Sequence, residues 1–420
     1  MMVWINAAEE RQLKDALVER FVRYAKVWTT SDPKIADTPS TSGQWDLARL
    51  LHSELTALGI EAELTDHCYV LARIPSNLPP ETPAPETIGF SAHLDTAEEV
   101  SGKDVKPCVV TNYDGRKIVL RDGVVLDPGA DADLAAAAGK TIVHTDGSTL
   151  LGADDKAGIA AIVCAADFLL SHDEVKHGPI EIIFTPDEET GKGLPEFPLE
   201  KITSKVCYTL DGGAGGELEI ECFNAYGVDA RFLGRAIHPG AAHGVLVNAA
   251  LMAASYSAML PRNESPEATD GYYGFYCLMN ISGCHEEASL RLIVRDFTRS
   301  GMERRIAALE SFARAVEAQF PGGKVILDAK PTYYNMKEKI ESRPEVFDKL
   351  KEAAENIGVD FTVKPIRGGT DGARLAELGI PAPNIFTGGR NFHSRAEWLL
   401  VEDILAACRL VIELAAVWAV

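Results

Sequence analysis

The stretch TIGFSAHLDT, residues 87–96, is a short apolar run that ends on His93 and Asp95. An apolar run of this length is typical of a buried strand. Side chains two positions apart in a strand point to the same side, so the Asp95 carboxylate can hydrogen-bond one ring nitrogen of His93 and fix its tautomer. The stretch therefore predicts a buried strand that carries a histidine and its carboxylate partner to the edge of a sheet.

Further apolar runs alternate with helical patterns on both sides of this strand. They read YVLARI (69–74), GIAAIVCAADFLL (158–170), IEIIFTP (180–186) and KVCYTLDGG (205–213). One of the helical patterns runs from about Trp45 to Leu58. This alternation predicts the α/β fold class, with a mostly parallel central sheet flanked by helices.

A different pattern begins near Phe223, and 420 residues exceed what one core usually organises. NAYGVDARFLGR (224–235) alternates apolar and polar residues like a half-exposed antiparallel strand, and it begins a β-α-β-β-α order. After Pro331 the α/β pattern returns and ends in a helix from Val401. We therefore predict one domain from residues 1–222 and 331–420, with a smaller α+β domain, residues 223–330, inserted into it.

Charge and composition exclude several classes of protein. The net charge is −21, from 62 acidic and 41 basic residues, which argues against nucleic acid or an anionic membrane as a partner. Neither an apolar run long enough to span a membrane nor the pattern of a signal peptide is present. The eight cysteines are scattered without a CxxC pair, which predicts free thiols in a reducing compartment, the cytoplasm.

Acidic and histidine side chains follow almost every predicted strand. In open α/β sheets, ligands bind beyond the carboxyl ends of the strands. Imidazoles and carboxylates are the ligands of two-metal hydrolytic sites, and a glutamate beside a metal-bound water is a natural general base. The side chains at these ends are His93, Asp95, Asp154, Asp155, Asp187, Glu188, Glu189, Asp211 and His393. Their joint occurrence predicts a dinuclear, zinc-type site.

Each feature alone also has a structural interpretation. A single histidine after a strand is commonly a hydrogen-bonded polar residue, and a DEE triplet is commonly a solvated loop. Asp154 or Asp155 is suited to cap the helix that follows it, and Asp211 before two glycines is suited to a turn.

Taken together, the motifs resemble the peptidase T family of tripeptide aminopeptidases. That family lies within the wider group of two-zinc hydrolases that includes glutamate carboxypeptidases and aminoacylases. The resemblance runs from about Pro39 to the C-terminus. The strings that carry it are LLGADDKAGIA (150–160), FTPDEETGKG (184–193), YTLDGG (208–213), HPGAAHGVLVNA (238–249), TDGYYGFY (269–276), IRGGTDGARL (366–375) and PAPNIFTGGRNFHSRAEW (381–398).

The resemblance implies a role for each residue of the site. His93, Asp154 and Asp211 would bind one metal ion. Asp154, Glu189 and His393 would bind the other, so that Asp154 bridges the two. Glu188 would be the general base that activates a metal-bridging water, and Asp95 would be the partner of His93. A cis peptide between Asp154 and Asp155 is also implied.

For the inserted segment, the resemblance implies a lid and dimerisation domain, and hence a homodimer. His238 in RAIHPGAA would polarise the scissile carbonyl, in related dimers at the partner's site, although a turn histidine before proline is the alternative. Arg295 and Arg367 are candidates to hold a peptide carboxylate, because a guanidinium binds one bidentately. Both are equally suited to structural ion pairs.

These observations predict a metal-dependent aminopeptidase that releases the N-terminal residue of tripeptides or other short peptides. Two divalent ions are expected; the ligands favour zinc, and cobalt or manganese would also be accepted. The alternative on the same scaffold is a carboxypeptidase or an N-acyl-amino-acid deacylase. A catalytically inactive peptide-binding protein would be expected to lack a ligand or the base, and every such position is filled here. A purely structural protein would not explain acids at so many strand ends.

Overall fold

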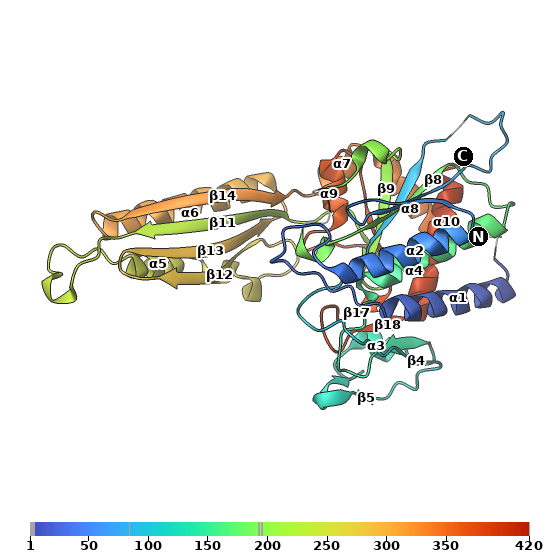
Figure 1. The fold of residues 1–420 in the computed structure, drawn as a ribbon, viewed down its shortest axis with the longest axis horizontal. Helices are drawn as coiled ribbons and strands as arrows, with labels where there is room; N and C mark the ends of the chain where they lie inside the picture. The colour runs from blue at the N-terminus through green and yellow to red at the C-terminus, as the bar shows by residue number, and fades with distance from the viewer. Residues whose placement is uncertain (1–4, 84, 192–193, 195, 420) are drawn as a thin grey trace. The chain divides into compact units, whose positions relative to one another are not determined.

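The computed structural model describes residues 5–83, 85–191, 194 and 196–419 (Figure 1). Lys192 and Gly193, the end of FTPDEETGKG, lie outside these residues. The chain divides into two compact units. The first comprises Met1–Ile220, Glu338–Lys364 and Thr370–Val420, and the second comprises Glu221–Lys337 and Pro365–Gly369.

The first unit is built on an eight-stranded sheet. Its strands, in spatial order, are β1 (Glu61–Leu64), β2 (Val70–Ile74), β8 (Ile180–Thr185), β3 (Ile88–His93), β9 (Val206–Gly212), β16 (Asn384–Phe386), β10 (Glu217–Glu219) and β15 (Thr362–Val363). The four central strands, β8, β3, β9 and β16, are mutually parallel. Strands β2 and β10 flank them in antiparallel pairing. The predicted α/β class with a mostly parallel sheet is confirmed.

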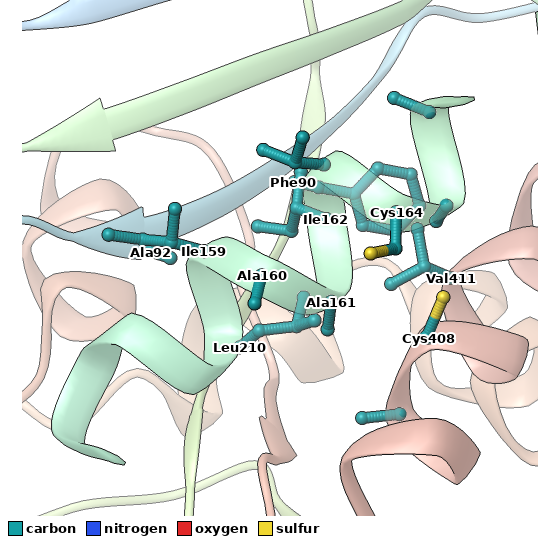
Figure 2. Packing of buried hydrophobic residues seen from close by; sticks show 14 of the residues in the cluster. Phe90, Ala92, Ile159, Ala160, Ala161, Ile162, Cys164, Leu210, Cys408 and Val411 are labelled. Atoms are coloured by element: carbon teal, nitrogen blue, oxygen red, sulfur yellow. The ribbon is translucent and has the colours of Figure 1, made fainter. Parts of the chain in front are cut away.

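Helices cover this sheet. They are α1 (Ala7–Ala25), α2 (Ser42–Ala57), α4 (Ala153–Ser171), α8 (Pro344–Asn356), α9 (Asp371–Glu377) and α10 (Val401–Val417). Helix α4 packs against β3 and β9 and also against α1 and α10. It is apolar around nearly its whole circumference, which is why it occupies the interior. Figure 2 shows Phe90, Ala92 and Leu210 of the sheet and Val411 of α10 around it.

Gly158 of α4 lies against strand β9. A Cβ atom added there would lie 2.0 Å from the carbonyl oxygen of Leu210 and 2.5 Å from Oδ1 of Asp155. Only glycine lets the helix approach the strand this closely. The glycine of GADDKAG therefore determines how near the turn that carries Asp154 lies to the strand that carries Asp211.

Replacing Gly158 with alanine is expected to lower the free energy of unfolding by about 1–3 kcal/mol, because the backbone must move to relieve overpacking. Urea denaturation measures this change. Gly368→Ala is the matched control, since an added Cβ at Gly368 meets nothing within 4 Å. Equal stability of the two variants would contradict the prediction.

A second, smaller sheet joins distant parts of the first unit. Its strands, in order, are β17 (Gly389–Arg390), β18 (Trp398–Leu400), β7 (Ile142–His144) and β4 (Cys108–Val110). The hairpin β5 (Ile118–Val119) and β6 (Val125–Leu126) and the helix α3 (Ala132–Ala136) belong to the same segment. Trp398 is fully buried in a separate hydrophobic cluster here. The sequence analysis did not predict this sheet.

The second unit is a four-stranded antiparallel sheet with two helices. The strand order is β12 (Phe275–Gly283), β13 (Glu287–Asp296), β11 (Asn224–Leu233) and β14 (Lys324–Tyr333). Helices α5 (Ala249–Ala258) and α6 (Arg299–Gln319) share one hydrophobic core with the sheet (Figure 1). Strand β14 was not predicted, although VILDA alternates in polarity, and the predicted boundary at Pro331 falls inside it.

Among the described residues, no helix is both long and apolar enough to cross a membrane.

Candidate metal centre

Parallel strands bring the predicted residues to one edge of the sheet. Strand β3 ends at His93, β9 contains Asp211 near its end, and β8 ends at Thr185 just before the DEE turn. These strands are neighbours in the order β8-β3-β9. Their carboxyl ends therefore meet at the edge where open α/β sheets bind ligands.

The first cluster joins His93, Asp154 and Asp211. Nε2 of His93 lies 2.8 Å from Oδ1 of Asp154 and 3.4 Å from Oδ1 of Asp211. Nδ1, on the other side of the ring, lies 3.1 Å from the Asp95 carbonyl oxygen and 3.3 Å from its Oδ1. The ring thus presents Nε2 to two carboxylates, while Asp95 holds Nδ1.

The second cluster joins Asp154, Glu189 and His393. Nε2 of His393 lies 3.3 Å from Oδ2 of Asp154 and 3.1 Å from Oε2 of Glu189. The two oxygens of Asp154 therefore face different clusters. In each cluster the three ligand atoms lie within 4.8 Å of one another. This is the arrangement that a carboxylate shared between two ions requires.

The turn that carries Glu188 and Glu189 is held from two sides. The Asp95 carboxylate accepts hydrogen bonds from the backbone amides of Glu188, at 3.0 Å, and Glu189, at 3.2 Å. Asp187 begins the turn with a φ of 57°. Its carboxylate accepts bonds from the Ser40 amide, at 2.7 Å, and from Nε2 of Gln44, at 2.7 Å. Asp95 therefore contacts both His93 and the turn that contains the candidate base.

The two neighbouring aspartates of the ADDKAG motif have different partners. Asp154 faces the histidines, whereas Asp155 accepts hydrogen bonds from the amides of Gly158, at 3.2 Å, and His93, at 3.1 Å. The bond from Gly158 is of the helix-capping type, so the structural interpretation applies to Asp155 alone. The peptide between the two aspartates is cis, as the resemblance implied.

The electrostatics of the clusters fit a cation. Burial and the nearby charge of Asp211 raise the pKa of the Glu188 carboxyl well above its usual value. Burial and the charge of Asp154 raise the pKa of Glu189 to about 8. Oε1 of Glu189 is buried and has no hydrogen-bond partner among the described residues. So many crowded carboxylates cannot all ionise unless positive charge compensates them.

The predicted residues of the second unit have partners of their own. Nδ1 of His238, an exposed residue, accepts a hydrogen bond from the Gly240 amide at 3.1 Å, which leaves Nε2 as the donor of the neutral ring. Arg295 donates to the Val294 carbonyl oxygen at 3.1 Å and stacks on Tyr333. Arg367 donates to the carbonyl oxygens of Thr269, Gly271 and Tyr273, so its guanidinium holds the loop of the TDGYYGFY motif.

Comparison with known proteins places the chain in a family. The model of peptidase family M20/M25/M40 matches residues 142–416. A peptidase T from a Geobacillus species is 45% identical over 405 residues, which is 96% of this chain and 98% of that protein. The chain belongs to the peptidase T family. It is a peptidase.

Two solved structures share the fold of this peptidase T family member. The aminopeptidase PepT from Bacillus cereus has a TM-score of 0.75 at 24% identity and covers 97% of this chain and 99% of its own. A tripeptidase from Staphylococcus aureus has a TM-score of 0.75 at 19% identity and covers 97% of this chain and 98% of its own.

Two polar residues beside the clusters were missed by the sequence analysis. Oδ1 of Asn384 accepts a hydrogen bond from the Asp211 amide at 3.1 Å, and its Nδ2 donates to the carboxylate of half-buried Glu219 at 2.6 Å. Glu397 lies in the string that ends NFHSRAEW, and its carboxylate contacts the turn that carries Asp154. Both residues lie in the string PAPNIFTGGRNFHSRAEW (381–398), in which only His393 was predicted to belong to the site.

Proposed function

We propose that this peptidase is a metal-dependent aminopeptidase that releases the N-terminal residue of tripeptides. The observation that carries the proposal is the pair of three-residue clusters that share Asp154, with Glu188 on the adjoining turn. The peptidase T relatives and the fold shared with an aminopeptidase and a tripeptidase support the choice of substrate.

His93, Asp154 and Asp211 would hold one divalent ion, and Asp154, Glu189 and His393 would hold the other. The unpartnered Oε1 of Glu189 and the crowded acids are consistent with two cations. Nitrogen and oxygen ligands favour zinc, and cobalt or manganese are also compatible. When bound, the ions would supply Lewis-acid polarisation of the scissile carbonyl and acidify the attacking water.

Glu188 acts as the base in this proposal. It takes a proton from the attacking water and returns it to the leaving amine. A carboxyl whose pKa is raised by burial is suited to both transfers, since it holds the proton between the two steps. Asp95 positions this base through the Glu188 amide and orients His93 through Nδ1.

His238 would polarise the scissile carbonyl by donating from Nε2, because Nδ1 is engaged by the Gly240 amide. Replacing His238 with alanine is expected to lower kcat by about 10²–10³-fold, as loss of one such donor does, with little change in KM. Steady-state kinetics on a tripeptide measure this effect. His243→Ala is the control, because His243 is another exposed histidine five residues further along the chain. A wild-type kcat for His238→Ala would exclude the role.

Arg295 and Arg367 remain candidates to hold the carboxylate of the peptide.

We also propose a homodimer formed through the second unit, which would act as a lid. Strand β12 lies at the edge of its sheet and exposes Leu278, Met279 and Ile281, as a strand that pairs with another copy would. Sedimentation of wild type and Ile281→Glu tests this, since a dimer of this kind should dissociate in the variant.

The cysteines support a cytoplasmic location, because all eight are free thiols. Cell fractionation in the native host tests the location.

Hydrolysis of three peptides tests the main proposal. A free tripeptide, its N-acetylated form and a longer peptide are incubated with and without a chelator. Cleavage of the free tripeptide alone, from its N-terminus and abolished by the chelator, is the expected result. Faster cleavage of the acetylated peptide would move the assignment to a deacylase or a carboxypeptidase.

A further inference from the structure

The Glu397 carboxylate binds the backbone of the turn that carries Asp154. Oε2 accepts hydrogen bonds from the amides of Leu151, at 2.6 Å, and Gly152, at 2.9 Å. Oε1 accepts bonds from the amides of Ala153, at 2.7 Å, and Asp154, at 3.3 Å. Glu397 is only 1% exposed. Both its oxygens are thus used to hold successive amides at the start of helix α4.

The same residue ends the loop that carries His393. The hydroxyl of Ser394 donates to the Asn391 carbonyl oxygen at 2.6 Å and accepts from the Ala396 amide at 3.2 Å. The Glu397 amide donates to the Ser394 carbonyl oxygen at 3.3 Å. We call residues 391–397 the His393 loop. Because these bonds close the loop on itself, the positions of His393 and Glu397 are coupled.

The His393 loop therefore reaches Asp154 twice. Glu397 holds its backbone amide, and Nε2 of His393 lies 3.3 Å from its carboxylate. Among the hydrogen bonds of the described residues, Glu397 is the only charged side chain that accepts from the Asp154 amide. The distance between the Asp154 carboxylate and the His393 ring therefore depends on where the His393 loop holds both His393 and Glu397.

We propose that Glu397 is a positioning residue that fixes the His393 loop against the Asp154 turn and thereby sets the geometry of the second metal site. This inference rests on the metal sites proposed above. A carboxylate at a helix N-terminus makes charge-assisted bonds and interacts favourably with the helix dipole, so it is a strong restraint. Residues that orient metal ligands in this way typically change metal affinity by about 10–100-fold when they are replaced.

Zinc binding to Glu397→Gln tests the inference. Glutamine keeps the size of the side chain but presents an NH₂ group to amides that need an acceptor. After removal of metal with a chelator, zinc affinities are measured by competition with a chromophoric chelator. We expect the second zinc ion to bind about 10–100-fold more weakly, the first to bind nearly as in wild type, and excess zinc to restore hydrolysis.

Glu181→Gln is the matched control. Glu181 is also buried, and its carboxylate accepts bonds from the amides of Thr203, at 3.0 Å, and Ser204, at 2.8 Å. It lies on β8 without a role in the clusters, so its replacement should lower stability and leave both zinc affinities unchanged. Wild-type zinc affinities in Glu397→Gln would overturn the inference. Failure of the wild-type protein to bind two ions would instead overturn the proposed function.

Ser394→Ala covers the case in which Glu397→Gln does not fold. It removes the two hydroxyl bonds that help close the His393 loop but leaves the four bonds that the Glu397 carboxylate accepts. The second zinc ion should again bind more weakly than in wild type. Unchanged binding in Ser394→Ala would show that the loop does not transmit the position of Glu397, which also overturns the inference.

Discussion

Glu188→Gln is expected to lower kcat for a tripeptide by about 10²–10⁴-fold, the contribution of a general acid–base group. Glutamine preserves the volume of the side chain and cannot accept the proton of the attacking water. The Glu188 amide would still bond to Asp95, so the turn and Glu189 should stay in place. Metal content, measured by elemental analysis, should therefore remain that of the wild type.

The two measurements together distinguish a base from a ligand. If Glu188→Gln lost a metal ion along with its activity, Glu188 would be a ligand and the assignment of Glu189 would have to change. Retention of wild-type kcat would exclude both roles. Glu98→Gln serves as the control, because Glu98 is an exposed carboxylate on the chain that follows β3.

Asp154→Asn should have a comparable effect on activity for a different reason. The two oxygens of Asp154 face the two histidines, one in each cluster. An amide supplies only one oxygen and no charge, so both ions should bind much more weakly. Bound metals supply several kcal/mol of charge stabilisation, which corresponds to at least about a thousand-fold in rate.

Asp211→Asn provides the comparison for Asp154→Asn. Asp211 belongs to the first cluster only, with Oδ1 at 3.4 Å from Nε2 of His93. Titration with zinc should show one strong site remaining in Asp211→Asn and none in Asp154→Asn. Equal loss in the two variants would contradict the assignment of Asp154 as the shared ligand, whatever the activities are.

Local patterns were sufficient for the central parallel strands and for the residues at their tips. The run TIGFSAH forms β3, and IEIIFT forms β8, because a buried parallel strand needs little more than a short apolar segment. The register of β3 with β8 and β9 then places His93 and Asp211 at one edge. The identities of the clustered residues came from the motif strings.

Pairings between segments distant in the chain were not predicted. The small sheet joins Trp398 to His144, and no local pattern of two or three residues specifies such a partner. Short strands depend on their neighbours for stability, so their sequences carry little information of their own. Strand β14 is different, because it has ten residues and the alternating polarity of VILDA was a local signal that could have predicted it.

The sequence by itself determined the fold class, the order of the main elements and the chemical types gathered at the strand ends, because hydrophobic periodicity and short motifs act over a few residues. Only the tertiary structure decided that Asp155, and not Asp154, makes the helix-capping bond with the Gly158 amide. It also decided that the amides at the start of α4 are held by Glu397, 243 residues beyond Asp154. Buried backbone amides must find an acceptor, and the chain's three-dimensional path determines which side chain is near enough to supply it.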